Sequence, residues 1–242
     1  MNWFLLNSGK CGAAFNMALD EALLENVAYI GKPVLRFYGW TEPAATFGYF
    51  QNYADVERAT PLRPLVRRPT GGGIVPHDAD WTYSFVAPPG HEWHLLKAEE
   101  SYRQIHEWIQ RTFAKLEIET ELAFAKKSAL RAPHSAIPSA CFVGHEKFDL
   151  LRRGKKIAGA AQRRNKLGLL IQGSIQKPEK PEFRIQNSEA HLRKEFENAM
   201  CEVAASEFGI NWADFSSDAK MVEDSAKLVR EKYSQADYNR WR

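Results

Sequence analysis

Residues 33 to 88 carry one short β-type run after another and no sustained helical period, so a sheet is the most constrained part of the fold. The runs read PVLRFYGW, AATFGYFQ, PLVRRP, GGIVP and DWTYSFVAP. They are rich in β-branched or aromatic residues, and turn-forming residues separate them. We predict a strand-rich sheet over this stretch and expect it to form the core.

Helical patterns flank the predicted sheet. Asn16 is placed to cap an amphipathic helix through NMALDEALLENVAY, with Asp20 and Glu21 off its apolar side. The strongest helical period runs from residue 97 to 116 and should pack on the sheet. Near the C-terminus, EAHLRKEFENAMCEVAASEFG ends at Gly209 as a helix with a glycine stop would, and DAKMVEDSAKLVREKYSQADYNRW predicts a second, more polar helix.

Two segments lie between these helices. Residues 126–140, KKSALRAPHSAIPSA, lack a sustained period and predict a loop long enough to act as a lid or binding loop. The following KFDLLRRGKKIAGAAQRR has a turn at Arg153-Gly154, and NKLG turns again before LLIQGSI. This pattern predicts a three-stranded meander.

The composition is ordinary for a soluble globular protein and excludes several classes. A chain of 242 residues with 44% hydrophobic and 26% charged residues fits one domain, 1–242, with C-terminal helices from about residue 185. A formal net charge of +3 is too small to argue for nucleic acid. No basic leader and no run of 18 apolar residues occur, so we expect neither secretion nor a membrane span.

The cysteines are Cys11, Cys141 and Cys201, an odd number without a spaced pair. This pattern favours neither a disulfide framework nor a zinc ribbon, and it fits a reducing cytoplasm. We expect Cys11 and Cys201 to be buried as small apolar residues.

Cys141 differs from the other two by its position. It ends the proline-containing loop beside a cationic segment, where a thiolate is favoured and a nucleophile can form. His145 is a poor base for it, because four residues along a strand span about 13 Å. We therefore expect Lys156 or His77 to activate the thiol.

A run of three glycines, Gly71 to Gly73, follows Arg67 and Arg68 in RRPTGGGIVPHD. Bare backbone admits a ligand closely and can turn N–H groups toward an oxygen, and guanidinium groups favour carboxylate and phosphate. The alternative is a β-turn or bulge with two solvated arginines. The run matches neither a Walker loop nor the spaced glycines of a dinucleotide fold.

Nearby histidines suggest a metal site only weakly. His77 and Asp78 would point to opposite faces of an extended chain, and HEWH, which holds His91 and His94, lacks the spacing and third ligand of a zinc helix. Such residues are more often hydrogen-bonded turn groups. We retain only His77, as a wall residue of an active site.

A basic stretch runs from Arg152 to Lys166 without an acidic residue. Such a stretch attracts an acidic partner. Within it, IAGAA at 157–161 has small side chains that leave room for a ligand, and Lys156 could meet an oxygen that bears charge. For Arg153 and Lys155 we prefer the alternative of a polar edge hairpin.

These two segments resemble a known family. RRPTGGGIVPHD resembles the Arg-Arg-x-x-Gly-Gly-Gly-x-x-x-His-Asp signature of the lipoate ligase and octanoyltransferase family, and GKKIAGAAQRR is similar to its lysine segment. The likeness runs from about residue 12 to 176. It departs at Ala160, Gln172 and Pro76, where the family often has serine, histidine and an aromatic residue.

The resemblance implies an α+β fold of the biotin and lipoate ligase type, a mixed sheet flanked by helices. Members attach lipoate or octanoate to one lysine of a lipoyl domain. Cys141-Phe142 stands fifteen residues before Lys156, as in the cysteine-dependent octanoyltransferases of the LipM type. The resemblance makes Cys141 and Lys156 catalytic. It assigns substrate binding to Arg67, Arg68, Gly71, Gly72, Gly73, His77, Asp78, Gly159 and Ala160.

The partners implied are octanoyl-acyl carrier protein as donor, and lipoyl domains of 2-oxoacid dehydrogenases or the glycine cleavage H protein as acceptor. No cofactor or metal is expected. Three alternatives stay open: a lipoate ligase that uses ATP and magnesium, an amidotransferase that moves octanoate or lipoate between protein domains, and a non-catalytic binder of acidic carrier domains.

Overall fold

The computed structural model describes residues 1–125, 144–177 and 189–242. The strands are β1 (Asn2–Cys11), β2 (Val34–Trp40), β3 (Ala44–Phe47), β4 (Leu65–Arg67), β5 (Val75–His77), β6 (Asp80–Ala87), β7 (Glu121–Leu122), β8 (Leu150–Arg152), β9 (Lys155–Asn165), β10 (Gly168–Gln176) and β11 (Asn211–Asp214). The helices are α1 (Ala13–Ile30), α2 (Tyr53–Ala59), α3 (Glu92–Leu95), α4 (Ala98–Lys115), α5 (Glu189–Phe208), α6 (Ala219–Leu228), the π-helix η2 (Val229–Tyr233) and α7 (Ala236–Arg240).

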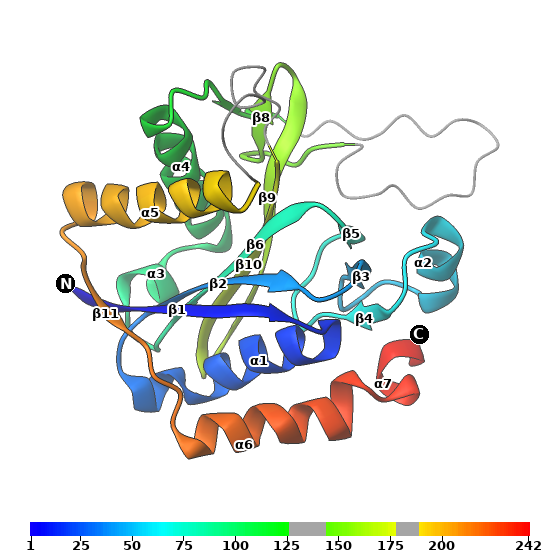
Figure 1. Ribbon diagram of the computed structural model, residues 1–242. Helices are drawn as coiled ribbons and strands as arrows, with labels where there is room; N and C mark the ends of the chain where they lie inside the picture. The colour runs from blue at the N-terminus through cyan, green and yellow to red at the C-terminus, as the bar shows by residue number, and fades with distance from the viewer. Residues whose placement is uncertain (126–143, 178–188) are drawn as a thin grey trace.

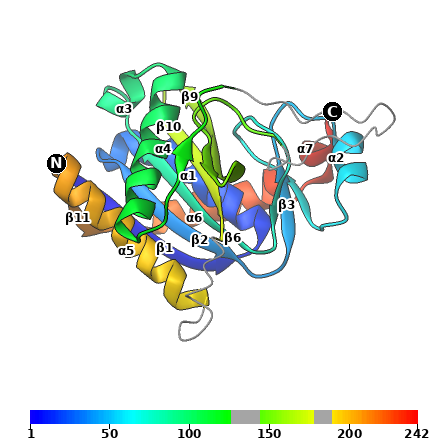
Figure 2. The same cartoon turned by 90° about the horizontal axis from the view of Figure 1, so that it is seen from above.

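A mixed sheet with strand order β11-β1-β2-β6-β10-β9-β8-β7 forms the centre of the molecule. β1 runs parallel to β2 and β11, and the remaining pairs are antiparallel. Helices α4 and α5 cover one face and α1 and α6 the other (Figures 1 and 2). Each face buries its own hydrophobic cluster. The predicted α+β class with a mixed sheet flanked by helices is confirmed.

The prediction of a sheet over residues 33–88 needs correction, because this stretch is divided. β2 and β6 belong to the large sheet, whereas β4, β3 and β5 form a separate three-stranded sheet. Helix α2, which the sequence did not predict, lies between β3 and β4. The small sheet, α2 and α7 lie at one end of the molecule (Figure 1). The division leaves room between the two sheets for the cavity described below.

The first helix begins earlier than predicted. α1 starts at Ala13, and Asn16 is not its cap but a fully buried residue of its first turn. The Asn16 amide donates to the carbonyls of Cys11 and Gly39 at 3.2 and 2.9 Å. Because these bonds tie α1 to the ends of β1 and β2, the side chain serves packing between elements rather than the helix terminus.

Helix α4 and the meander β8-β9-β10 are confirmed. Ile105, Ile109 and Phe113 on α4 are completely buried in the large core cluster. The turn between β8 and β9 places Arg153 at φ +51° and Gly154 at φ +72°. Two successive positive φ values match the right-handed twist of a hairpin, which explains the tight connection.

The C-terminal helices are more divided than predicted. α5 ends at Phe208, before Gly209 at φ +64°. The predicted last helix is interrupted, because η2 and the residues after it separate α6 from α7. Glu21 on α1 accepts from Lys232 Nζ at 2.5 Å and from the Tyr233 hydroxyl at 2.7 Å, which holds η2 against α1.

The predicted loop at 126–140 and Cys141 lie outside the described residues. Among the helices that the structure describes, none is long and apolar enough to cross a membrane.

Candidate active site

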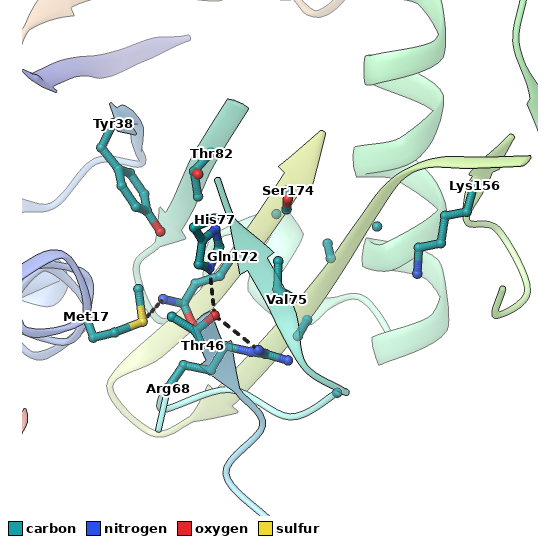
Figure 3. A pocket seen from close by; sticks show the side chains of 15 residues that line it. Met17, Tyr38, Thr46, Arg68, Val75, His77, Thr82, Lys156, Gln172 and Ser174 are labelled. Carbon is teal, nitrogen blue, oxygen red and sulfur yellow. Dashed lines mark hydrogen bonds between the residues drawn. The ribbon is translucent and has the colours of Figure 1, made fainter. Parts of the chain in front are cut away.

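A cavity that opens to solvent lies between the small sheet and strands β9 and β10 of the large sheet. Its lining is contributed by α1, β2, β3, β5, β6, β9 and β10, together with the segment after β4 (Figure 3). Part of the strand side of the wall consists of Ala160, Ala161 and Gly173, which carry a methyl group or no side chain. Because these residues add little bulk, the cavity has a largely bare strand surface.

The cavity brings together predicted site residues from two segments that are far apart in the sequence. It does not include every predicted residue. Those that line it are Arg68, Gly72, His77, Lys156, Gly159 and Ala160. Those outside its lining are Arg67, Gly71, Gly73 and the exposed Asp78.

Arg67 is a structural residue in this fold. Its buried guanidinium donates to the carbonyls of Tyr49, Gln51, Tyr238 and Asn239. Burial lowers the pKa of Arg67. Because its guanidinium donors are used by carbonyls of its own chain, Arg67 ties β4 to α7 and is not among the residues that line the cavity. This placement corrects its prediction as a substrate-binding residue.

The glycine run is held in place by Arg68. The Arg68 guanidinium donates to the carbonyls of Gly71 and Gly73, each at 2.7 Å. Gly72 has φ +90°, and a Cβ there would lie 2.8 Å from Arg68 Nη2 and 3.6 Å from the Cβ of Ala161. The run therefore faces strand β9 across the cavity. A cradle of its N–H groups for a ligand oxygen stays a prediction.

His77 is a fixed residue of the cavity wall, and its place in an active site stays a prediction. Its Nδ1 lies 2.8 Å from Asp80 Oδ2 and its Nε2 lies 2.8 Å from Thr46 Oγ1. The ring stacks on Trp40 with centroids 3.8 Å apart. Because a carboxylate only accepts, Nδ1 donates to Asp80. Arg68 donates to Thr46 Oγ1 at 3.3 Å, so this hydroxyl contacts both side chains.

A buried network beside the cavity was missed by the sequence analysis. Asp20, predicted to lie on the polar side of the first helix, is completely buried and pairs with Arg36 at 2.6 Å. It also accepts from Tyr38, Ser84 and Gln172. The signal for this network was Arg36, the single charge in the otherwise apolar strand VLRFYGW. A charge inside a buried strand requires a partner.

Lys156 stands at the other side of the cavity, apart from these polar groups (Figure 3). Its Nζ lies 2.7 Å from Asp149 Oδ2, and the two side chains are only 7% and 0% exposed. Asp149 also accepts from the Tyr102 hydroxyl on α4. The predicted cation at the cavity is thus present, and its carboxylate partner is a residue that the sequence analysis did not single out.

His106 packs beside this group, and its burial predicts a pH-dependent stability. Burial lowers the pKa of His106 from 6.5 to about 4. Below about pH 6.5 the unfolded chain binds a proton on His106 that the folded chain does not bind until the pH nears 4. This contribution to the free energy of unfolding is therefore fully present above about pH 6.5 and is lost as the pH falls toward 4. The loss should reach about 2 kcal/mol at pH 5.

Urea unfolding between pH 7.5 and 4.5 checks this expectation. His106→Gln should flatten the pH dependence of the free energy of unfolding, whereas His191→Gln, at an exposed imidazole, should leave it as in the unchanged protein. Equal slopes for all three proteins would contradict the assignment.

The family model described as the lipoyl protein ligase A/B catalytic domain matches residues 12–178. The chain belongs to this lipoyl protein ligase A/B family. An octanoyltransferase LipM from Geobacillus kaustophilus is 41% identical over 186 residues, which cover 72% of this chain and 64% of that protein. The octanoyltransferase LipM of Bacillus subtilis is 38% identical over 183 residues with the same shares. The match thus spans just under two thirds of these relatives' length.

Solved structures support the fold of this lipoyl protein ligase A/B family member. The putative lipoate protein ligase Ta0514 from T. acidophilum, with bound lipoic acid, matches with a TM-score of 0.77 at 22% identity over 100% of both chains. A lipoate-protein ligase A bound with ATP matches with a TM-score of 0.76 at 21% identity over 99% of both chains. At these identities the likeness shows the fold alone.

Some basic side chains of the stretch at 152–166 form contacts within this family member. Arg163 pairs with Glu21 at 3.1 Å. Arg164 donates to the carbonyls of Trp93 and His94. Exposed positions remain at Arg153, Lys155 and Lys166. The surface charge available to a partner is therefore smaller than the sequence stretch suggested.

Two cysteines and two histidines outside the cavity have buried or hydrogen-bonded surroundings. Cys11 and Cys201 are half-buried rather than fully buried, and burial raises the pKa of the Cys201 thiol to about 12. His91 accepts from Trp93 N, and His94 Nε2 lies 3.0 Å from the Asn165 carbonyl. The two histidines of HEWH are hydrogen-bonded as predicted, but they lie at the N-cap of α3 and within it rather than in a turn.

Proposed function

We propose that this protein transfers an octanoyl group from acyl carrier protein to a lysine of a lipoyl domain, through a thioester on Cys141. The observation that carries the proposal is the cavity that joins a bare strand surface at Ala160 and Ala161 to the ammonium of Lys156. An acyl chain requires the apolar surface, and a developing oxyanion requires the cation. The similarity to octanoyltransferases of 38 to 41% identity supports the same chemistry.

In the first step the Cys141 thiolate attacks the carbonyl carbon of the octanoyl thioester. Lys156 stabilises the thiolate and then the tetrahedral oxyanion. The bond between the carbonyl carbon and the carrier's sulfur breaks, and the carrier leaves as a thiolate that takes a proton from solvent. Gly72 of the glycine run and strand β9 form the floor of the acyl tunnel.

In the second step a neutral lysine amine of the acceptor attacks the acyl-enzyme. A C–N bond forms, the C–S bond to Cys141 breaks, and the surplus proton of the nitrogen is lost to solvent. His77, fixed by Asp80 and Thr46, orients the attacking group. The acceptor is a lipoyl domain of a 2-oxoacid dehydrogenase or the glycine cleavage H protein. A fold neighbour, a bipartite lipoate protein ligase of Thermoplasma acidophilum, is described with its E2 lipoyl domain.

The donor and acceptor are steered by the exposed positive charges of the basic stretch. Lys155 and Lys166 are exposed, and they lie in the segment that supplies Lys156. Their attraction for acidic carrier domains accelerates encounter and weakens as salt rises. The proposed cycle consumes no nucleotide and needs no metal.

Intact-protein mass measurement tests the proposal. Incubation with octanoyl-acyl carrier protein and no nucleotide should add one octanoyl group to the protein, and Cys141→Ala should abolish this adduct. Cys201→Ala is the matched control and should keep it, since the Cys201 thiol has its pKa raised to about 12. Lipoylation by Cys141→Ala that depends on ATP would falsify the transfer mechanism.

The second candidate is an ATP-dependent lipoate ligase, which the fold of the ligases bound to lipoic acid and to ATP favours. In that enzyme Arg68, the glycine run and Lys156 would hold the carboxylate and phosphate of lipoyl-adenylate, and magnesium would be required. An octanoylated lipoyl domain offered as donor distinguishes a third chemistry, transfer between protein domains, because only an amidotransferase would use it.

A further inference from the structure

The ammonium of Lys156 pairs with the Asp149 carboxylate, which groups from other parts of the fold hold in place. Asp149 directly precedes β8, and its fully buried carboxylate pairs with Lys156 Nζ at 2.7 Å. The same carboxylate accepts from the Tyr102 hydroxyl on α4 and from the Glu146 backbone N–H at 2.7 Å. A carboxylate with several donors has little freedom to move, so it fixes the position of the lysine.

Tyr102 keeps its proton in this cluster. Burial and the neighbouring Asp149 raise the pKa of Tyr102 well above its usual value. Its oxygen also lies 3.4 Å from the backbone N of Ala160, a residue of the cavity wall. Tyr102 therefore connects α4, the Asp149 carboxylate and strand β9 at the point where the cavity begins.

The path of the lysine side chain depends on Gly159. A Cβ at position 159 would lie 2.5 Å from Lys156 Cε, 2.6 Å from Nζ and 3.1 Å from Asp149 Oδ1. Real Cβ atoms do not approach so closely, so the lysine folds back over a strand position that must lack a side chain. Gly159 was predicted to bind substrate, and its contacts show that it also makes space for the ion pair.

We propose that Asp149 and Tyr102 are positioning residues that place the Lys156 ammonium at the cavity, with Gly159 providing the space for it. The two residues act through Lys156 and do not contact the substrate. This inference rests on the proposed function only for the step at which Lys156 acts. The placement itself can be measured without an acyl donor.

The first measurement is a double-mutant cycle on the rate of octanoyl transfer. Asp149→Asn should lower kcat by about tenfold or more and leave KM within about twofold, because the ammonium acts on the transition state rather than on binding. In a Lys156→Met background, Asp149→Asn should have no further effect. An equal loss in both backgrounds would overturn the inference, since Asp149 would then act independently of the lysine.

The second measurement is the rate at which trinitrobenzenesulfonate modifies Lys156 in the absence of donor, followed by peptide mass spectrometry. Asp149→Asn releases the lysine from its carboxylate, and Tyr102→Phe removes a donor that fixes this carboxylate, so Lys156 should react about threefold faster or more in both variants. Glu99→Gln is the matched control, because it breaks the exposed Lys147–Glu99 pair and should leave the reactivity of Lys156 unchanged.

Gly159→Ala separates placement from folding. Its methyl group would meet the flexible end of Lys156 rather than rigid backbone, so the thermal midpoint should change little while kcat falls and Lys156 reacts faster. If Asp149→Asn does not fold, the other two variants, Tyr102→Phe and Gly159→Ala, still test the placement of the Lys156 ammonium. Unchanged reactivity of Lys156 in these two variants would overturn the inference. Failure of wild-type protein to form an octanoyl adduct, with altered reactivity in the variants, would refute only the proposed function.

Discussion

Replacing Asp20 by alanine is expected to lower the free energy of unfolding by about 3–5 kcal/mol. The Asp20 carboxylate pairs with Arg36 at 2.6 Å, and both side chains are completely buried. Removing the carboxylate leaves a guanidinium charge in the core, and Tyr38 and Ser84 lose their acceptor. Urea unfolding followed by tryptophan fluorescence measures the loss, with the denaturant slope checked for constancy.

Two comparisons make this prediction specific to the buried charge. Asp55→Ala removes one partner of an exposed pair, Arg58–Asp55, and should cost less than about 1 kcal/mol. The double variant Asp20→Leu with Arg36→Met removes both charges and should be more stable than Asp20→Ala alone. A loss for Asp20→Ala no larger than that for Asp55→Ala would show that the buried pair contributes nothing.

Gly48→Ala is expected to reduce the proposed octanoyl transfer by about a hundredfold, a loss that follows from a displacement of about 1 Å in a site. A Cβ at position 48 would lie 2.0 Å from the carbonyl oxygen of Gly72 and 2.9 Å from its carbonyl carbon. Backbone atoms cannot rotate away as a side chain can, so the glycine run must move as a unit. The rate of acyl-adduct formation, measured by intact mass, reports the effect.

Gly71→Ala is the matched control within the run itself. A Cβ there meets no atom within 4 Å, and Gly71 is not among the glycines with positive φ. This variant should keep its activity, and reduced freedom of the unfolded chain should make its stability equal or slightly higher. A large loss of activity in Gly71→Ala, or none in Gly48→Ala, would contradict the geometry of the run.

Local patterns were sufficient for most of the fold. The period at 97–116 and the turn at Arg153-Gly154 depend on neighbouring residues, and both appear as predicted. Asn16 was misinterpreted because a cap and a buried bridging amide have the same sequence signature, and only the positions of Cys11 and Gly39 distinguish them. The division of residues 33–88 into two sheets was also invisible, because pairing partners lie far along the chain.

The site was predictable in its residues and less so in their roles. Gly72, His77 and Lys156 do line one cavity. Asp149 was missed although it stands seven residues before Lys156, because a register shift between Leu150 and Leu151 alters which residues face each other across the hairpin. Cys141 lies outside the described residues, so its role as nucleophile stays a prediction.

The contact between α7 and β4 has a consequence for where this protein can be cut. The family match ends at residue 178, yet Arg67 donates to the carbonyls of Tyr238 and Asn239, and the Asn239 side chain accepts from the Arg67 backbone N–H at 2.8 Å. A fragment trimmed to the matched range would leave a buried guanidinium with half of its acceptors missing, directly before the glycine run. A fragment that keeps all the acceptors of Arg67 must therefore extend some sixty residues beyond the family match, to at least Asn239.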